Sequence, residues 1–459
     1  MSHISSEEIK RISDKNMARF YDYLRLESVS AQGRQINQTA EAVQSFIENA
    51  GGEAKILELE GAHPVVYGFF AAGPSGDAEK TLLFYDHYDV QPEDPLDEWK
   101  TVPFEPTEKD GILYARGVSD NKANFVARIN AIEAYKNTEG GLPVNVKFFV
   151  EGEEEIGSPH VNDYLEAYAD LFAADVCIWE SGSKDSEERL KISAGVKGIA
   201  YYEARVKSAD IDMHSSLAAI ADNSAWRLVQ ALASMRNVNN EITVDGFYDM
   251  MTAPTELEKK VANRIPFDPE ASKQTYGLKH PLITDQLSYS AEEALVFYPT
   301  LTISGLLSGY TGPGAKTILP RQAMAKIDVR LVPGYEPDKV TEILRQHLDR
   351  HGFEDVALEL ITSVMPFRTS LEDPFVETVI DSAKEVYGED KVVLEPNSAG
   401  TGPMYGFGKY LNVPILGSGT EWEKSGAHAP NENIRLTDFY QGVEHMVVLL
   451  DSFKNSGND

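Results

Sequence analysis

The sequence predicts an α/β fold with a mainly parallel central sheet covered by helices, into which a smaller α+β domain is inserted. The chain has 459 residues and a mass of 50.8 kDa, which is more than a single hydrophobic core usually holds. Short apolar runs alternate with helical patterns in the first half of the chain and again near its end, and such alternation is typical of a parallel sheet covered by helices. Between these parts the pattern changes to strands with alternating polar residues.

The first predicted elements are two helices, followed by buried strands. Helical spacing is found in ISSEEIKRISDKNMARFYDYLRL and in NQTAEAVQSFIENAGG, where Gly51 and Gly52 are expected to end the second helix. Strands are predicted for the short apolar runs VVYGFFAA, TLLFYDHYDV, VKFFVEGEEE and VCIWESG, which are bounded by turn residues. Helical spacing returns in DNKANFVARINAIEAYKN, so strands and helices alternate in this part of the chain.

From about Gly198 the pattern favours a smaller α+β layer. Strand-like runs occur in GIAYYEARVKS, LTISGLL, ILPRQAMAKIDVRLVP and VALELITSV, and helical spacing occurs in NSAWRLVQALASMRN and PDKVTEILRQHLDRHG. The stretch from Glu241 to Ser288 is a long polar connection with scattered helix signals. The α/β pattern then returns with PFVETVIDSAKEVYG, VPILGSGT and the closing helix LTDFYQGVEHMVVLLDSF. We therefore expect one domain from residues 1–197 and 367–459 and an inserted domain from residues 198–366.

Composition excludes several classes of partner. The chain has 73 acidic and 42 basic side chains and a formal charge of −31, which repels nucleic acid and anionic lipid. The start MSHISSEEIKRISDK has no apolar segment, and no run approaches the ~18 apolar residues that a membrane span needs. We expect a cytoplasmic protein with no nucleic-acid or membrane partner. The single cysteine, Cys177, excludes an internal disulfide and lies in the apolar run DVCIW, where we expect a buried, inert thiol.

Histidine and carboxylate side chains occur where three of the strand-like runs end. They are His87 and Asp89 after the first run, Glu151, Glu153, Glu154 and Glu155 after the second, and Glu180 after the third. In an open α/β sheet, ligands bind outside the carboxyl ends of the strands, so these side chains are expected to converge on one crevice. Asp120, in RGVSDNK, lies where a helix begins, and taken alone it could equally be a helix cap.

Histidine and carboxylate ligands without clustered cysteines are typical of a hydrolytic divalent-metal site, with zinc first and manganese or cobalt as substitutes. Two metals need a bridging carboxylate and about two terminal ligands each, and together they can activate a water near neutral pH. A further carboxylate must then take the proton of that water and pass it to the leaving amine. The EGEEE run has enough carboxylates for both a ligand and a base.

Four motifs together resemble the M20 family of metallopeptidases, including its carnosinase-like and other cytosolic dipeptidases. They are HYDVQP after a strand, GVSDNKA at the start of a helix, EGEEEIGS at the end of a strand, and a late GAHAPNE. They occur in the family's order, and the resemblance runs from about residue 10 to the C-terminal helix. It implies an α/β catalytic domain with an inserted lid and dimerisation domain, two metal ions, and a peptide-like substrate.

The resemblance also implies roles for individual residues. Asp120 would bridge two metals, Asp89 would orient an imidazole by accepting its other N–H, and Glu154 would be the general base. The terminal ligands would be His87, Glu155, Glu180 and His428. Glu180 departs from related dipeptidases, which often have aspartate there, and this leaves the peptidase subtype open. Glu153 makes a one-residue shift in the assignment of base and ligand an alternative.

The inserted domain contributes further residues by the same resemblance. His214 matches the family histidine that enters the partner subunit's active site and steadies the oxyanion, which would require a homodimer. Arg330 matches the arginine that grips a substrate carboxylate. Thr401 and Gly402, in SAGTGP, match a small-residue loop that approaches the same carboxylate.

Several of these residues also have a purely structural interpretation. His87 with Asp89 could be a surface pair, EGEEE a solvated acidic loop, His214 a helix cap, and Arg330 an exposed partner for one of the many acids. His347 falls on the apolar stripe of its helix, so we expect it to be packed rather than to bind metal. No role is predicted for five further histidines, which are His63, His160, His280, His351 and His445.

The sequence thus predicts a two-metal amide hydrolase for dipeptides or small peptide-like substrates with a free carboxylate. One alternative is an N-acyl amino acid deacylase or another small amidohydrolase of the same family. A more distant alternative is a non-catalytic, metal-dependent binding protein on the same scaffold, which the presence of Glu154 beside the ligands argues against.

Overall fold

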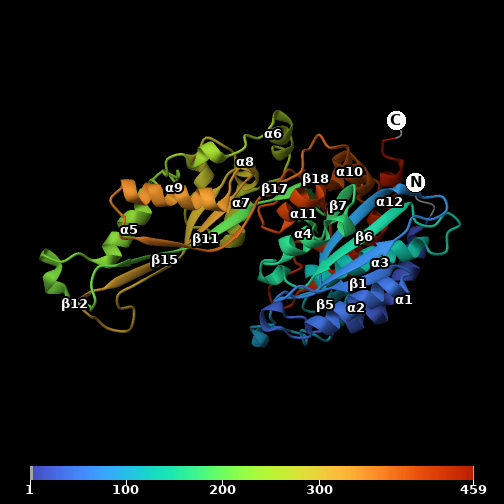
Figure 1. Ribbon diagram of the computed structural model, residues 1–459, viewed down its shortest axis with the longest axis horizontal. Coiled ribbons are helices and arrows are strands. Elements are labelled where there is room, and N and C mark those ends of the chain that lie inside the picture. The colour runs from blue at the N-terminus through green and yellow to red at the C-terminus, as the bar shows by residue number, and fades with distance from the viewer. Residues whose placement is uncertain (1–3, 458–459) are drawn as a thin grey trace. The chain divides into compact units, whose positions relative to one another are not determined.

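The computed structural model describes residues 4–457, which form two compact units (Figure 1). Unit 1 comprises the described residues up to Gly195, Arg368–Pro396, and those from Pro403 onward, whereas unit 2 comprises Val196–Phe367 and Asn397–Gly402. The boundaries expected from the sequence lay after residues 197 and 366. Residues 397–402, which we had assigned to the first domain, belong instead to unit 2.

Unit 1 is built on a large mixed sheet whose centre is parallel, as predicted. Its strand order is β1 (Glu53–Leu57), β2 (Val65–Phe70), β6 (Val144–Glu151), β3 (Asp77–His87), β7 (Val176–Trp179), β19 (Ile415–Gly417), β9 (Leu190–Ser193), β8 (Ser183–Lys184) and β20 (Glu421–Trp422), with β18 (Val392–Glu395) beside β9. Strand β3 runs parallel to both β6 and β7, and β7 runs parallel to β19. The β1–β2–β6 edge is antiparallel.

Helices cover both faces of this sheet. Successive side chains of its strands point to opposite faces, so each face presents side chains that the helices bury. One face packs against α1 (Ser6–Leu24), α2 (Ile36–Asn49), α3 (Ala123–Tyr135), α10 (Pro374–Tyr387) and α12 (Leu436–Asn455). The other face carries α4 (Val161–Phe172) and α11 (Met404–Leu411). Within β3, Phe84 lies in the first core, whereas the ring of its neighbour Tyr85 stacks at 3.6 Å on Trp179 and meets Phe407 of α11 on the second face.

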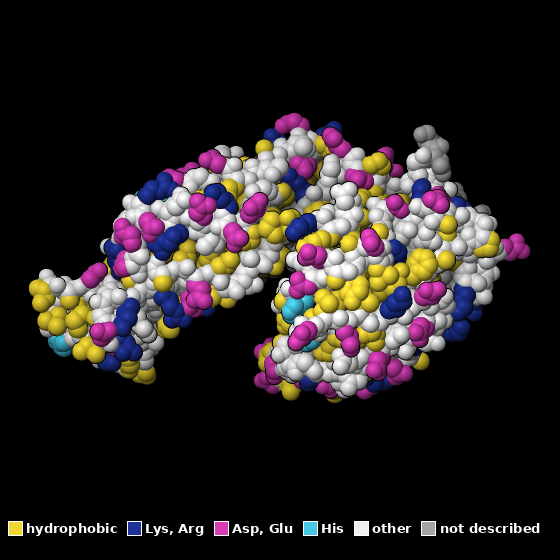
Figure 2. Space-filling model, in the orientation of Figure 1, with side chains coloured by type: hydrophobic (Ala, Val, Ile, Leu, Met, Phe, Trp, Pro, Cys, Tyr) yellow, Lys and Arg dark blue, Asp and Glu magenta, His cyan; other side chains and the backbone are white. Residues whose placement is uncertain are grey.

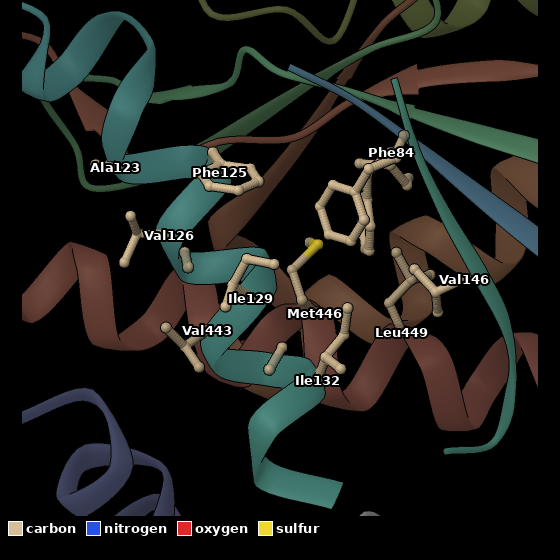
Figure 3. Close-up of a cluster of buried hydrophobic side chains, with 14 of the residues drawn as sticks. Phe84, Ala123, Phe125, Val126, Ile129, Ile132, Val146, Val443, Met446 and Leu449 are labelled. Atoms are coloured by element: carbon tan, nitrogen blue, oxygen red, sulfur yellow. The ribbon is translucent and has the colours of Figure 1, made fainter. Parts of the chain in front are cut away.

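Helix α3 is buried on nearly every side because it packs against the sheet, α1 and α12. Figure 3 shows Phe125 and Ile129 of α3 packed together with Phe84 of β3 and Met446 of α12. This packing fixes the N-terminal end of α3, which directly follows the segment that carries Asp120. Cys177, in β7, is buried as predicted. None of the helices in the described part of the chain is long and apolar enough to cross a lipid bilayer.

Unit 2 contains an antiparallel sheet in the order β13 (Thr300–Ser308), β15 (Gln322–Leu331), β11 (Gly198–Lys207) and β16 (Ala357–Val364). Buried and partly exposed residues alternate along β15, and its buried face packs with α5 (Ser224–Ser234) and α9 (Pro337–Arg350). His347 of α9 is buried, as predicted, and its Nε2 lies 3.1 Å from Ser234 Oγ. One-sided burial of this kind produces the alternating pattern seen in the sequence.

Smaller elements complete the two units. A three-stranded sheet of unit 1 joins β4 (Thr107–Lys109), β5 (Ile112–Tyr114) and β21 (Asn433–Arg435). In unit 2, β12 (Met213–His214) pairs with β14 (Ile318–Leu319). The stretch from Glu241 to Ser288, predicted as a connection with scattered helix signals, contains α6 (Glu256–Ala262) and α7 (Pro269–Tyr276), and α8 (Ala291–Phe297) follows it.

Candidate metal centre

Three neighbouring parallel strands bring the first site residues to one edge of the sheet. His87 is the last residue of β3, Glu180 directly follows β7, and the turn Glu154–Ile156 follows β6. Because β6, β3 and β7 are adjacent and parallel, their carboxyl ends meet at the same edge. The convergence expected from the sequence is therefore present in the fold.

The five predicted metal ligands form two groups that share Asp120. In one group, His87 Nε2 lies 3.0 Å from Asp120 Oδ1 and 3.2 Å from Glu180 Oε2. In the other, His428 Nε2 lies 3.0 Å from Asp120 Oδ2 and 2.9 Å from Glu155 Oε2. The two oxygens of one carboxylate thus face two different sets of donors, which is the arrangement that a bridging ligand requires.

The donor atoms fit divalent cations. Each group offers one imidazole nitrogen and carboxylate oxygens, the ligands that hydrolytic metal ions take. Ligand atoms around a tetrahedral ion with bonds of about 2.0–2.2 Å lie roughly 3.3–3.5 Å apart, close to the 2.9–3.2 Å observed. His87, Asp120 and Glu155 each offer a ligand atom within 4.8 Å of one another. The site can therefore hold a pair of ions, one beside each oxygen of Asp120.

When no cation is bound, protons on the clustered side chains reduce the repulsion between their carboxylates. Hydrogen bonds to Asp120 and Glu155 raise the pKa of His428 to about 10, and burial raises the pKa of Glu154 and Glu180 well above the usual range. Burial also raises the pKa of Glu155. His428 therefore carries a proton at neutral pH that a bound cation would have to displace.

Metal loading is accordingly expected to release protons at pH 7. Because the pKa values of His428 and the glutamates lie above their usual values, the metal-free form is protonated below them, and metal affinity should rise with pH and fall on acidification. Calorimetric titration of metal into chelator-treated protein in two buffers of different ionisation enthalpy measures the number released. Equal heats in the two buffers, together with a constant affinity from about pH 6 to 8, would contradict this charge assignment.

Asp89 connects the imidazole of His87 to the glutamate turn. His87 Nδ1 lies 3.0 Å from the Asp89 backbone oxygen and 3.3 Å from its Oδ1. The same carboxylate accepts hydrogen bonds from the backbone N–H groups of Glu154, at 3.2 Å, and Glu155, at 3.0 Å. Asp89 is fully buried, so its geometry couples the orientation of the His87 ring to the position of the turn.

The three consecutive glutamates have different surroundings. Glu153 is buried and faces away from the cluster, where its carboxylate accepts from the backbone N–H of His63 at 2.9 Å and lies 2.9 Å from His160 Nδ1. Glu155 contacts His428, and its Oε2 also accepts from Gln91 Nε2 at 2.9 Å. Glu154 lies between them, half-buried, with its pKa raised by burial. This geometry favours Glu154 as the base and Glu155 as the ligand.

Glu432 is a site residue that the sequence reasoning missed. Its buried carboxylate accepts from Arg116 Nη1 at 2.7 Å and from the backbone N–H groups of Gly117, Ser119 and Asp120 at 2.8–3.0 Å. It therefore holds the loop that carries Asp120. The signal was present in GAHAPNE, four residues after His428, but no local pattern links that position to residues 116–120.

Two other neighbours were also missed. Asn121 Nδ2 donates to Glu180 Oε2 at 2.9 Å, and Gln91 orients Glu155 as described above. His428 itself has a backbone φ of 61°, in the left-handed region, and its side chain remains 55% exposed. A non-glycine residue held in this conformation is uncommon and is often found at functional sites.

The residues predicted for substrate binding lie in unit 2. Arg330, in β15, donates from Nη1 to Thr401 Oγ1 at 2.8 Å, and its Nε lies 3.3 Å from Asp328 Oδ1. Gly402 follows Thr401 and is buried. His214 is exposed on the separate β12–β14 pair, where its Nδ1 accepts from the backbone N–H of Ser216 at 3.2 Å. The structure thus brings Arg330 and Thr401 together, and it places His214 at a short helix start.

The chain is similar to proteins of one peptidase family. The profile of the peptidase family M20/M25/M40 matches residues 83–452. The Beta-Ala-His dipeptidase of Rattus norvegicus is 30% identical over 79% of this chain and 75% of its own length. The Cys-Gly metallodipeptidase DUG1 of Saccharomyces cerevisiae is 28% identical over 86% of this chain and 82% of its own. The structure of an M20 family metallo-carboxypeptidase, Sso-CP2 from Sulfolobus solfataricus, superposes with a TM-score of 0.86 and 37% identity, covering 96% of this chain and 99% of that one.

Proposed function

The chain belongs to the peptidase family M20/M25/M40, and from this premise we propose that it hydrolyses the amide bond of dipeptides or small peptide-like substrates with a free carboxylate. It is a metallopeptidase. The observation that carries the proposal is the pair of donor groups that share Asp120, with the carboxylate of Glu154 beside them. Relatives with about 30% identity bear dipeptidase names, which supports small substrates over proteins.

The residues of unit 1 divide the chemistry among them. His87 and Glu180 would hold one cation, His428 and Glu155 the other, and Asp120 both. Two zinc-type cations bound there would supply Lewis acidity for the scissile carbonyl and would lower the pKa of the attacking water. The Glu154 carboxylate takes the proton from the attacking water and delivers it to the leaving nitrogen. A pKa raised by burial suits a group that must first accept and then donate this proton.

Recognition of the substrate carboxylate is assigned to Arg330. A guanidinium binds a carboxylate through two parallel N–H bonds, which a lysine cannot do. Thr401 supports this assignment, because its hydroxyl accepts from Nη1 while Nε lies beside Asp328, which leaves the second N–H of Nη1 and those of Nη2 for a ligand carboxylate. Gly402 would allow the backbone to approach the same carboxylate.

We further propose a homodimer in which His214 of one subunit steadies the oxyanion formed in the other. Exposed apolar side chains surround the β12–β14 pair and suit a subunit interface; they are Ile211, Leu217, Ile220, Leu306, Leu307 and Tyr310. Figure 2 shows hydrophobic side chains gathered at this end of unit 2. Sedimentation velocity tests the proposed homodimer. A monomer at the concentration used for the activity assay would contradict it. Zinc as the native metal and a cytoplasmic location complete the proposal.

The substrate class is tested with Arg330→Lys and a panel of substrates. The substitution should raise KM for dipeptides about 10-fold to 100-fold with a smaller effect on kcat, because it removes a charge-assisted double hydrogen bond made before the chemical step. Dipeptide amides, which lack the free carboxylate, should be poor substrates for the wild-type enzyme. Steady-state kinetics on both variants, with metal-loaded protein, measures these effects.

Arg205→Lys provides a matched control, because Arg205 lies on the neighbouring strand β11, its side chain is largely exposed, and its Nε contacts Glu203 of the same strand rather than a residue assigned to substrate binding. Its kinetics should match those of the wild type. Equal turnover of dipeptides and their amides would refute carboxylate recognition. If N-acetyl or N-succinyl amino acids were turned over faster than every dipeptide, the enzyme would be a deacylase of the same family instead.

A further inference from the structure

A large cavity lies entirely within unit 2. Its volume is about 670 Å³, within the range of pockets that hold small molecules. The apolar part of its lining includes aromatic and aliphatic side chains, namely Tyr248, Leu282, Leu287, Tyr289, Tyr298 and Leu301. Tyr289 and Tyr298 stack with their ring centroids 3.6 Å apart. The cavity thus presents a preformed apolar and aromatic wall.

The charged side chains that line this cavity are basic, whereas the chain as a whole is acidic. Lys197, Arg236, Lys279 and Arg330 line the cavity, and no aspartate or glutamate is among the described lining residues. The chain as a whole has 73 acidic and 42 basic side chains, so a lining without any acid stands apart from the rest of the molecule. Such a pocket complements a ligand that combines an anionic group with an apolar body.

Lys197 and Arg330 identify the end of the cavity where the anion would bind. Lys197 is only 3% exposed, and its Nζ donates to the backbone oxygens of Ala294 at 3.2 Å and Tyr298 at 2.7 Å. In the described part of the chain no carboxylate lies within ion-pair distance of this ammonium, which can donate a third hydrogen bond. Burial, together with the nearby charge of Arg330, lowers the pKa of Lys197 to about 8. A bound carboxylate would relieve both effects.

We propose that this cavity receives the C-terminal residue of the substrate, with its carboxylate on Lys197 and Arg330 and an apolar or aromatic side chain against the tyrosine and leucine wall. The proposal rests on the proposed function, since it uses the same arginine and names the substrate class. It makes the enzyme selective for bulky apolar C-terminal residues over glycine. The gain should be 10-fold or more, because each methylene buried in an apolar pocket adds to binding.

The cavity is tested by partly filling it. Leu295, in α8, lines the cavity and is 45% exposed, so a tryptophan there can be accommodated without disturbing the core. Leu295→Trp should lower kcat/KM for Ala-Phe and Ala-Leu 10-fold or more and change that for Ala-Gly less than about 2-fold. Leu257→Trp is the matched control, because Leu257 is similarly exposed, at 39%, on the short helix α6 of the same unit but does not line the cavity.

A binding measurement separates failure of this inference from failure of the proposed function. Calorimetric titration of the metal-loaded protein with free L-phenylalanine and with glycine should show at least 10-fold tighter binding of phenylalanine, lost in Leu295→Trp and kept in Leu257→Trp. If dipeptides are hydrolysed but Ala-Phe and Ala-Gly are equivalent, or if Leu295→Trp slows both alike, the cavity assignment is wrong while the function stands. If no dipeptide is hydrolysed, the proposed function fails and so does the link between this cavity and catalysis, even where phenylalanine binds.

Discussion

Glu154→Gln is expected to lower kcat by about 10²-fold to 10⁴-fold, the usual contribution of a general acid–base group. The amide keeps the size and hydrogen-bonding capacity of the side chain but cannot accept a proton from water. Metal content should stay at the wild-type level, because the structure places Glu155, not Glu154, against His428. Single-turnover kinetics together with metal analysis of the purified variant measures both quantities.

Glu153→Gln is the matched control, with the same change one residue earlier. The Glu153 carboxylate faces His63 and His160, so this variant should retain kcat within a few-fold. If kcat fell further in Glu153→Gln than in Glu154→Gln, the general base would be Glu153 instead of Glu154. Unchanged turnover in Glu154→Gln would instead revive the interpretation of the chain as a metal-dependent binding protein.

Asp120→Asn should produce the second large effect, the loss of both metal ions and of activity. Asp120 is the residue whose two oxygens face the two donor groups, and an amide replaces one of these oxygens with a donor and removes the charge. We expect kcat/KM to fall about 10³-fold or more, since cations at this position contribute several kcal/mol of charge stabilisation. Metal analysis should show depletion of both ions, whereas His428→Ala should deplete mainly one.

Thermal unfolding gives an independent readout of the same substitution. The proposed ligands lie at the ends of β3 and β7 and in three loops, and bound ions would hold them together. Loss of the ions should therefore lower the Tm by about 2–4 °C for each kcal/mol of binding free energy removed. Chelation of the wild-type protein should lower its Tm to a similar value. Asp110→Asn is the control, because Asp110 is an exposed turn residue with a φ of 54° that asparagine readily adopts. Full metal content in Asp120→Asn would exclude Asp120 as the bridge.

Much of the fold was predictable because its signals are local. The central strands are buried on both faces, as β3 is from Leu82 to His87, and this produces continuous apolar runs such as TLLFY rather than alternation. In unit 2, one-sided burial of β15 produces the opposite pattern. Strand β8 was not predicted, because a strand of two residues has too few positions to show a period.

The candidate ligands could be found from the sequence because each lies at the end of a recognisable element or inside a motif. Their supporting residues could not. Glu432 reaches Arg116 and the Asp120 loop across more than three hundred positions, and Gln91 and Asn121 hold Glu155 and Glu180 through hydrogen bonds that no spacing reveals. Hydrogen bonds of this kind depend on where two loops meet, which side-chain periodicity does not encode.

The sequence by itself determined the α/β class and the histidine and carboxylate side chains that follow three of the strands, because these depend on burial periodicity and on which side chains follow which strand, whereas the roles of Asp120 and His428 were predicted from the resemblance of their motifs to a family. Only the tertiary structure decided that Asp120 divides its two oxygens between His87 and His428, that residues 397–402 join unit 2, and that Lys197 and Arg330 line one acid-free cavity. The physical reason is that a distance of about 3 Å between side chains far apart in sequence follows from the packing of whole elements, which no local segment specifies.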